Sequence, residues 1–147
     1  RRWSVKVEFV NPRQAGLAPE RAAALLAARH QAGGARVLVM APDPIQAGEV
    51  DRLLWTLDPA SFVPHARAGA EDQDQEPVLI ADGPENLNRA EVLLMLSPPP
   101  ELPLAEYQRL VLLVPAQEGP DLTRCRELYR QMQARPGVEL LHTTQVR

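Results

Sequence analysis

Residues 37–57 read VLVMAPDPIQAGEVDRLLWTL, and this stretch decides the fold class. Its first four residues form a continuous apolar run, which is typical of a strand covered on both faces within a parallel sheet. Asp43 then precedes Pro44, the order expected for a helix N-cap followed by a proline in the first turn. Gln46 stands where a capping box would place it, and the predicted helix runs to about Leu57.

The alternation of strand and helix continues on both sides of this stretch. Before it, the period-two pattern of residues 5–9 predicts a strand, and Pro19 opens a helix that ends before two glycines. After it, we expect strands at 77–81, 92–96, 110–114 and 138–142, a short helix before the third of these, and a helix at 120–135. This order predicts a single α/β domain over residues 1–147, with a Rossmann-like, mostly parallel sheet and helices on both faces.

Composition excludes several classes of protein. The chain has 147 residues and a net charge of −3, which argues against a surface that is basic throughout, as in many nucleic-acid-binding proteins. Its one cysteine cannot build a disulfide framework or a cysteine zinc cluster. Its apolar runs are far shorter than the roughly 20 residues that span a bilayer, and the N-terminus lacks a signal-peptide pattern. A cytoplasmic location is therefore expected.

The sequence contains no motif that predicts catalysis. The connection at 11–18 has one glycine and one proline, whereas a dinucleotide site needs a glycine-rich turn there. His30, His65 and His142 lie in three different elements without metal-ligand spacing, which favours two surface histidines and one structural one. We therefore expect no catalytic residue, no metal and no cofactor. A Rossmann-like nucleotide-binding enzyme is the alternative interpretation.

The helix predicted at 120–135 presents the most informative set of side chains. At roughly 100° per residue, Arg126, Tyr129, Arg130 and Gln133 form one stripe beside the apolar face that carries Cys125. Arginine offers a planar fork for carboxylates, and tyrosine supplies rigid contact area with a polar tip. The stripe therefore suits a short acidic peptide that ends in a hydrophobic residue. A plain solvated arginine face is the commoner alternative on geometry alone.

A second feature combines Leu54 and Trp55 with Phe62, which a proline-containing corner brings close together. Ordinary core packing is the favoured interpretation from the residues alone, and an exposed hydrophobic anchor for a partner is the functional one. The following residues, 66–76, are acidic and lack large apolar side chains, so we expect a solvated and mobile loop.

A resemblance to a known family favours the functional interpretation of both features. Residues 51–65 read DRLLWTLDPASFVPH, which resembles the signature Asp-x-x-Leu-Trp, a short spacer and Ser-Phe-x-Pro-His of the chi subunits of bacterial DNA polymerase III. Further similar pieces follow the family's order along nearly the whole chain: VEF at 7–9, PVLI at 77–80, RAEVLLML at 89–96, VP at 114–115 and RELYR at 126–130.

The resemblance implies a non-catalytic replication adaptor with a Rossmann-like fold, located in the cytoplasm at the replisome. Chi subunits pair with the psi subunit of the clamp loader, or with a repair helicase at the same surface, and Leu54, Trp55 and Phe62 match that region. They also bind the acidic C-terminal tail of single-stranded-DNA-binding protein, which ends in phenylalanine. The residues that match this tail site or lie near it are Val114, Arg124, Arg126, Tyr129 and Arg130.

Two departures from the family pattern bear on the tail site. Gln133 stands at a position that is basic in the family, and Arg124 or Arg135 is the candidate for a compensating charge. The acidic loop at 66–76 would repel an acidic tail, so it has to lie away from the helix. Direct binding of single-stranded DNA is a third interpretation, which ranks last because only 4% of the residues are aromatic.

Overall fold

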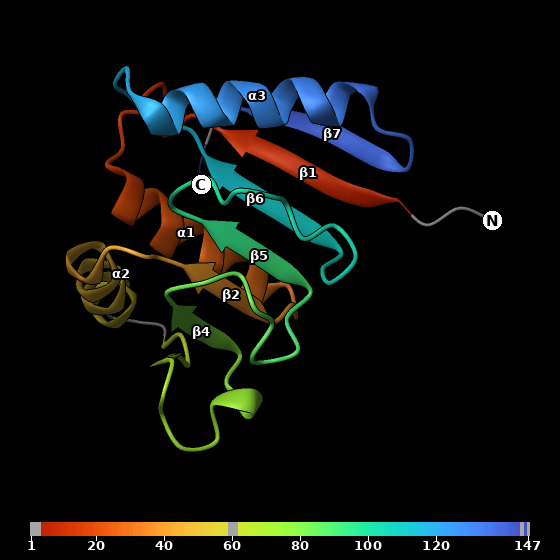
Figure 1. Cartoon of the computed structure of the whole chain (residues 1–147). Helices are drawn as coiled ribbons and strands as arrows, with labels where there is room; N and C mark the ends of the chain where they lie inside the picture. The colour runs from red at the N-terminus through yellow and green to blue at the C-terminus, as the bar shows by residue number, and fades with distance from the viewer. Residues whose placement is uncertain (1–3, 59–61, 145, 147) are drawn as a thin grey trace.

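The computed structural model describes residues 4–58, 62–144 and 146 (Figure 1). Its strands are β1 (Val5–Val10), β2 (Val37–Met40), β3 (Ala66–Arg67), β4 (Val78–Ala81), β5 (Val92–Met95), β6 (Arg109–Leu113) and β7 (Val138–Thr143). Its helices are α1 (Pro19–Ala32), α2 (Pro44–Thr56) and α3 (Pro120–Ala134), with a 3₁₀ turn η1 (Gln73–Gln75). The described strands form one sheet in the order β3-β4-β2-β5-β6-β1-β7, and every pairing in it is parallel.

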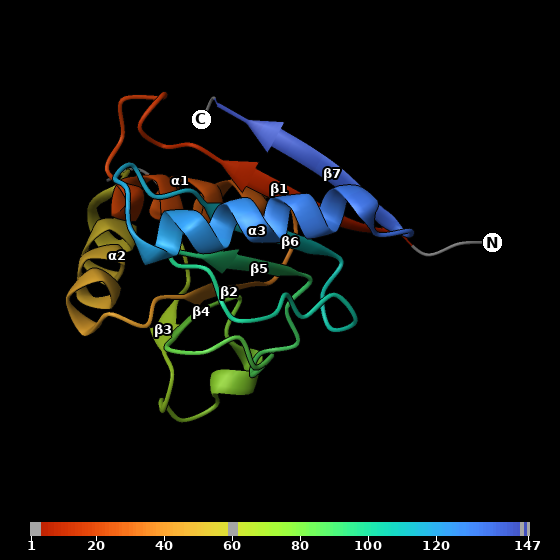
Figure 2. The same cartoon turned by 45° about the horizontal axis from the view of Figure 1, so that its top comes forward.

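Helices cover both faces of this sheet, which confirms the predicted fold class. Figure 2 shows α3 in front of the sheet and α1 behind it. On β2, Val37 and Val39 join the core beneath α1 and α2, whereas Leu38 and Met40 join the core on the α3 side. Side chains alternate between the faces of a strand, so a strand buried on both faces needs apolar residues at every position. This is the reason for the continuous apolar run in residues 37–40.

Helix α2 begins with the predicted N-cap, but the predicted capping box does not form. The Asp43 carboxylate accepts a hydrogen bond from the backbone N–H of Ile45 at 2.9 Å. Gln46 does not close a capping box: its side-chain amide donates instead to the carboxylate of Glu20, at 2.7 Å. Because Glu20 lies in the first turn of α1, the Gln46 side chain joins two helices on the same face of the sheet.

The face opposite α1 and α2 is covered by α3 and by loops. The short helix expected before β6 was a wrong prediction, because residues 97–108 form turns and bends. Leu102 and Tyr107 of this segment are nevertheless buried in the α3-side core. The Tyr107 hydroxyl donates to the backbone carbonyl of Pro84 at 2.7 Å, and burial raises the pKa of this hydroxyl. A loop of this kind can close a core without helical structure when its polar groups find partners.

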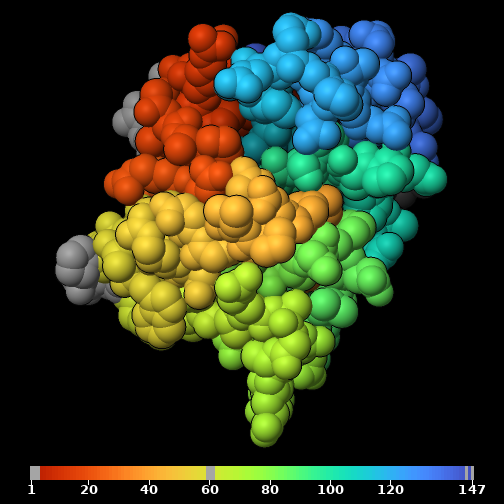
Figure 3. All heavy atoms as spheres, turned by 60° about the vertical axis from the view of Figure 1, so that its left-hand side comes forward, coloured from red at the N-terminus to blue at the C-terminus, as the bar shows by residue number. Residues whose placement is uncertain are grey.

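The acidic segment 66–76 lies at the edge of the sheet opposite β7. It holds the short strand β3 and the turn η1, so it is more regular than predicted. Side chains hold its backbone: Gln73 accepts from the N–H of Gly69 at 2.8 Å, and Arg36 and Asn88 donate to the carbonyls of Asp74 and Glu76 at 2.7 Å and 3.0 Å. The yellow-green protrusion at the bottom of Figure 3 belongs to this part of the chain, far from the blue α3 at the top. The expected separation from α3 is confirmed.

Candidate functional site

A cavity of about 340 Å³ opens between α3 and the carboxyl ends of the neighbouring strands. Two of its walls come from the end of β1 and from the residue after β6, and another comes from β7. Its lining consists of Phe9, Val114, Leu122, Cys125, Arg126, Tyr129 and His142. The carboxyl ends of parallel strands meet at one edge of an α/β sheet, which is where such proteins usually bind their ligands.

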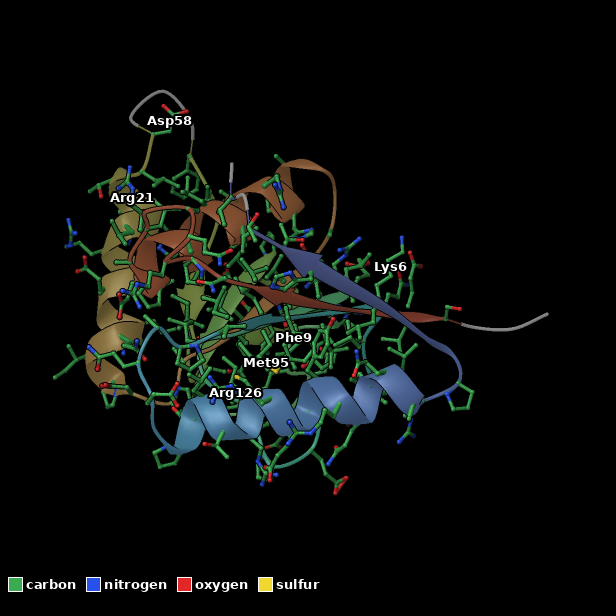
Figure 4. All side chains as sticks on the ribbon, turned by 90° about the horizontal axis from the view of Figure 1, so that it is seen from above. Lys6, Phe9, Arg21, Asp58, Met95 and Arg126 are labelled. Carbon is green, nitrogen blue, oxygen red and sulfur yellow. The ribbon has the colours of Figure 1, made fainter. Side chains whose placement is uncertain are left out.

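The floor of the cavity is apolar and rigid. Phe9 is 2% exposed and meets the ring of Tyr129 edge to face, with centroids 5.1 Å apart and an interplanar angle of 77°. Figure 4 shows Phe9 on the side of the sheet that faces α3, between the sheet and the helix. Cys125 is 2% exposed, as its place on the core face of the helix predicted. Burial, reinforced by the charge of Asp121, raises the pKa of the Cys125 thiol to about 12, so this group stays protonated near neutral pH.

The rim of the cavity carries a positive charge that already has a partner. The guanidinium of Arg126 donates two hydrogen bonds to the carboxylate of Glu118, at 3.2 Å and 3.1 Å. The side chains of this pair are 53% and 77% exposed, so water surrounds both. The hydrogen bonds that Arg126 donates to Glu118, followed by the charge of that carboxylate, raise the pKa of Arg126. The pair therefore presents a carboxylate and a guanidinium side by side at the mouth.

The structure brings together only some of the residues predicted for the tail site. Val114, Arg126 and Tyr129 line the cavity, and Arg130 lies exposed one turn further along α3. Arg124 does not line it: two residues correspond to about 200° around a helix, which places Arg124 roughly opposite Arg126. There its guanidinium lies 3.5 Å from Glu127. Arg124 therefore does not supply the positive charge that Gln133 lacks.

Several cavity residues were missed from the sequence. Leu122 lies on the predicted helix, but the stripe began at Arg126 and did not include it. Phe9 and His142 come from strands distant in sequence, and their inward side chains could have been placed only with the strand order known. Glu118 lies in the loop before α3, where no periodic pattern indicates the direction of a side chain.

A second candidate surface is an exposed aromatic patch, which we define as Trp55 and Phe62. Their side chains are 57% and 64% exposed, and their ring centroids lie 5.5 Å apart. Leu54 is 3% exposed and packs in the core beneath α1 and α2, so its predicted role as a partner contact is corrected. The reason is helical geometry, since successive residues point about 100° apart and α2 turns Leu54 inward where it turns Trp55 outward.

Buried polar contacts hold the aromatic patch in place. The side chain of His65 is 1% exposed, with Nε2 3.0 Å from the Asp51 carboxylate and Nδ1 2.7 Å from the carbonyl oxygen of Val63. Its ring also meets Trp55 edge to face, with centroids 4.7 Å apart. His65 thereby joins the segment after Phe62 to α2 and has a structural role. Of the two histidines expected at the surface, His142 is exposed, but His30 is partly buried.

The described residues lack two further features. No group of three or more His, Cys, Asp or Glu side chains among them is arranged to hold a metal ion. Within the same residues, no helix has the length and apolar character required to cross a membrane.

The comparisons with known proteins show the family of the chain. The model of the family described as DNA polymerase III chi subunit, HolC, matches residues 6–140. The chain belongs to the DNA polymerase III chi subunit family. A relative from Haemophilus influenzae named DNA polymerase III subunit chi is 34% identical over 119 residues, which cover 79% of this chain and 81% of that protein. The resemblance read from residues 51–65 and the later pieces is thereby confirmed.

Membership of the chi family sets the broad role of the chain. It is an accessory subunit in DNA replication that associates with the DNA polymerase III holoenzyme. The cavity beside α3 and the aromatic patch on α2 are two candidate binding surfaces on the described part of this chi-family chain.

Proposed function

We propose that this chi-family chain is a non-catalytic adaptor with two docking surfaces. The cavity beside α3 binds the acidic C-terminal tail of single-stranded-DNA-binding protein, and the aromatic patch binds the psi subunit of the clamp loader or a repair helicase that uses the same surface. The observation that carries this proposal is the apolar cavity with Arg126 at its mouth.

The cavity suits a single aromatic side chain. Pockets that hold whole small molecules measure about 300–1,000 Å³, so the 340 Å³ found here lies near the lower end of that range and has room for a benzyl group. Phe9 and Tyr129 offer ring faces and edges to such a group, and Val114 and Leu122 offer aliphatic contacts. Complete burial of a phenylalanine side chain contributes about 1.5–3 kcal/mol. The ring at the end of the tail therefore supplies much of the affinity.

The rim suits the charges that accompany that ring. Arg126 lies at the mouth, and Arg130 one turn on is exposed, so the carboxylates of an acidic tail meet two guanidinium groups along one side of α3. Exposed ion pairs contribute little to affinity and are screened over about 10 Å at 0.1 M salt. We therefore expect micromolar binding that weakens as salt is added.

The positions of the two surfaces fit an adaptor. The aromatic patch lies on and beside α2, which covers one face of the sheet, and the cavity lies beside α3, which covers the other (Figure 2). One partner on each surface leaves the other surface accessible. The acidic segment 66–76 lies at the sheet edge opposite β7, so its charges are distant from the cavity.

A calorimetric titration tests the tail site. The wild-type chain is titrated with a synthetic acidic peptide that ends in phenylalanine and with the same peptide lacking that residue. We expect micromolar binding for the first, a large loss for the second, and a loss for Arg126→Ala. Arg52→Ala is the matched control, because Arg52 is also an exposed helical arginine paired with a glutamate, Glu49, but lies on α2. Equal weakening by both variants would contradict the proposed site.

Co-purification tests the aromatic patch. We expect a tagged chain to retain psi, or a helicase at the same surface, and Trp55→Ala with Phe62→Ala to lose it while the tail peptide still binds. Loss of peptide binding in that double variant would indicate that the two surfaces are not separate. A single-stranded oligonucleotide at physiological salt should bind weakly, because the net charge is −3.

A further inference from the structure

One edge of the guanidinium at the mouth of the cavity is already occupied, because Glu118 accepts a hydrogen bond from each terminal nitrogen of Arg126. Both terminal nitrogens of Arg126 donate to the two carboxylate oxygens of Glu118, at 3.2 Å and 3.1 Å. This is the paired geometry in which arginine recognises a carboxylate. The Glu118 carboxylate therefore presents to Arg126 the same chemical group that an acidic peptide would bring.

The loop before α3 holds Glu118 in that position. Glu118 precedes Gly119, whose φ of 156° and ψ of −178° belong to a region that is essentially restricted to glycine. The chain turns at this glycine into Pro120, the first residue of α3, and Arg126 follows two turns later. The pair thus spans the loop and the helix at the mouth of the cavity, rather than joining neighbours on one helix.

We propose that Glu118 is an internal competitor for the ligand's carboxylate and that it determines which acidic chains the site can hold. This inference rests on the proposed function of the cavity. A ligand carboxylate that takes the same paired edge of Arg126 must displace Glu118, so one exposed ion pair replaces another and the exchange contributes little to binding. An acidic chain without an aromatic residue gains almost nothing at this rim. A chain that also fills the cavity binds through its ring.

Glu118 therefore weakens the binding of every carboxylate ligand that competes for Arg126. Many proteins carry exposed acidic segments, and an unpaired arginine beside an apolar hollow would attract them by charge alone. With the guanidinium neutralised internally, weakly interacting acidic chains remain unbound and the ring becomes the required feature. Unfavourable competition of this kind is an ordinary source of specificity.

The test compares Glu118→Gln with Glu127→Gln. Glu127 is the matched control, since it lies on α3, pairs with an arginine, Arg124, and loses the same charge, but it does not line the cavity. We expect Glu118→Gln to tighten both the phenylalanine-ended and the truncated acidic peptide by about two- to fivefold beyond Glu127→Gln, the range for one exposed ion pair. The affinity should also depend more steeply on salt, because one more ion pair forms on binding.

A double-variant cycle separates competition from any structural effect of the loop. In an Arg126→Ala background, Glu118→Gln should tighten the peptide no more than Glu127→Gln does in the same background, because only the loss of one negative charge remains and there is no guanidinium to compete for. Tightening beyond that of Glu127→Gln in this background would overturn the inference.

The outcomes also distinguish this inference from the proposed function. If the wild-type chain binds the phenylalanine-ended peptide and the two glutamine variants bind it equally, only the competitor role of Glu118 is refuted. If neither the wild-type chain nor Glu118→Gln binds either peptide, the tail site itself is refuted and the competitor role with it. Binding that is detectable only in Glu118→Gln would support the competitor role of Glu118 but would contradict tail binding by the wild-type chain.

Discussion

Filling the cavity from its own wall should raise stability and abolish peptide binding at the same time. Cys125 is the residue for this change, because it lines the cavity, is 2% exposed, and lies on the core side of α3. Replacing it in Cys125→Leu adds aliphatic carbon that can extend into the empty volume of about 340 Å³. Core substitutions to larger residues usually destabilise a protein because no space receives the added atoms, and here the structure provides that space.

The expected gain in stability and the expected loss of peptide affinity can each be estimated. Each buried methylene contributes about 0.8 kcal/mol, and the cavity is open on one side, so the added atoms should stabilise the fold by about 1 kcal/mol. For a domain of this size that corresponds to a rise of roughly 3 °C in the melting temperature. A ligand ring excluded from the cavity loses about 1.5–3 kcal/mol, so peptide affinity should fall roughly 10- to 100-fold.

The assay combines thermal unfolding with calorimetric titration of the phenylalanine-ended peptide. Cys125→Ala is the control: it removes the sulfur and enlarges the cavity, so it should lower stability slightly and leave the peptide bound. A folded Cys125→Leu that binds the peptide as tightly as the wild type would show that the ring does not enter this cavity. If Cys125→Leu is destabilised, Val114→Phe narrows the cavity from the opposite wall and repeats the binding test.

Three further predictions concern buried polar groups. His65→Ala should lower the free energy of unfolding by about 1–3 kcal/mol in urea titrations, because it leaves the carboxylate of Asp51 and a buried backbone carbonyl without the ring; an unchanged midpoint would contradict the structural role of His65. Arg109→Ala should cost about 3 kcal/mol in the same assay, since Glu8 is 7% exposed and would lose the partner 2.7 Å away, and the double change Arg109→Leu with Glu8→Leu should recover much of this loss. Burial and then the charge of Arg109 lower the pKa of His30 below 6.5 in the folded chain. The unfolded chain therefore binds a proton at His30 more readily, and the free energy of unfolding should fall as the pH drops below about 6.5. His30→Gln should reduce this pH dependence between pH 7.5 and 5.5, and an identical pH dependence in both proteins would refute the role of His30.

Local patterns in the sequence predicted the elements well. The apolar run at 37–40 and the cap at Asp43 correspond to β2 and the start of α2, and the final helix ends one residue earlier than predicted. These signals succeeded because they depend on backbone geometry and on burial at every strand position. The short helix before β6 failed because that loop closes the core through Tyr107 and its bond to Pro84, a distant contact that leaves no periodic pattern.

The sequence predicted only part of each candidate site. The stripe on α3 placed Arg126 and Tyr129 correctly, because both lie on one helix whose angular spacing is known. The choice between core and surface for Trp55 and Phe62 could not be made from their composition, and the structure shows them exposed. Leu54 was included with them although helical geometry turns it into the core.

Local patterns were enough to predict the class of fold, the family and the helix that carries the charged rim, since each depends on residues that are neighbours along the chain or recur at regular spacing. The existence of the cavity and the group at its mouth became evident only from the folded chain. Phe9, Val114 and His142 meet because the strand order places β1 between β6 and β7, and strand order is set by long-range packing. Glu118 meets Arg126 because a glycine turns the loop before α3, a conformation that becomes visible only when the backbone is folded.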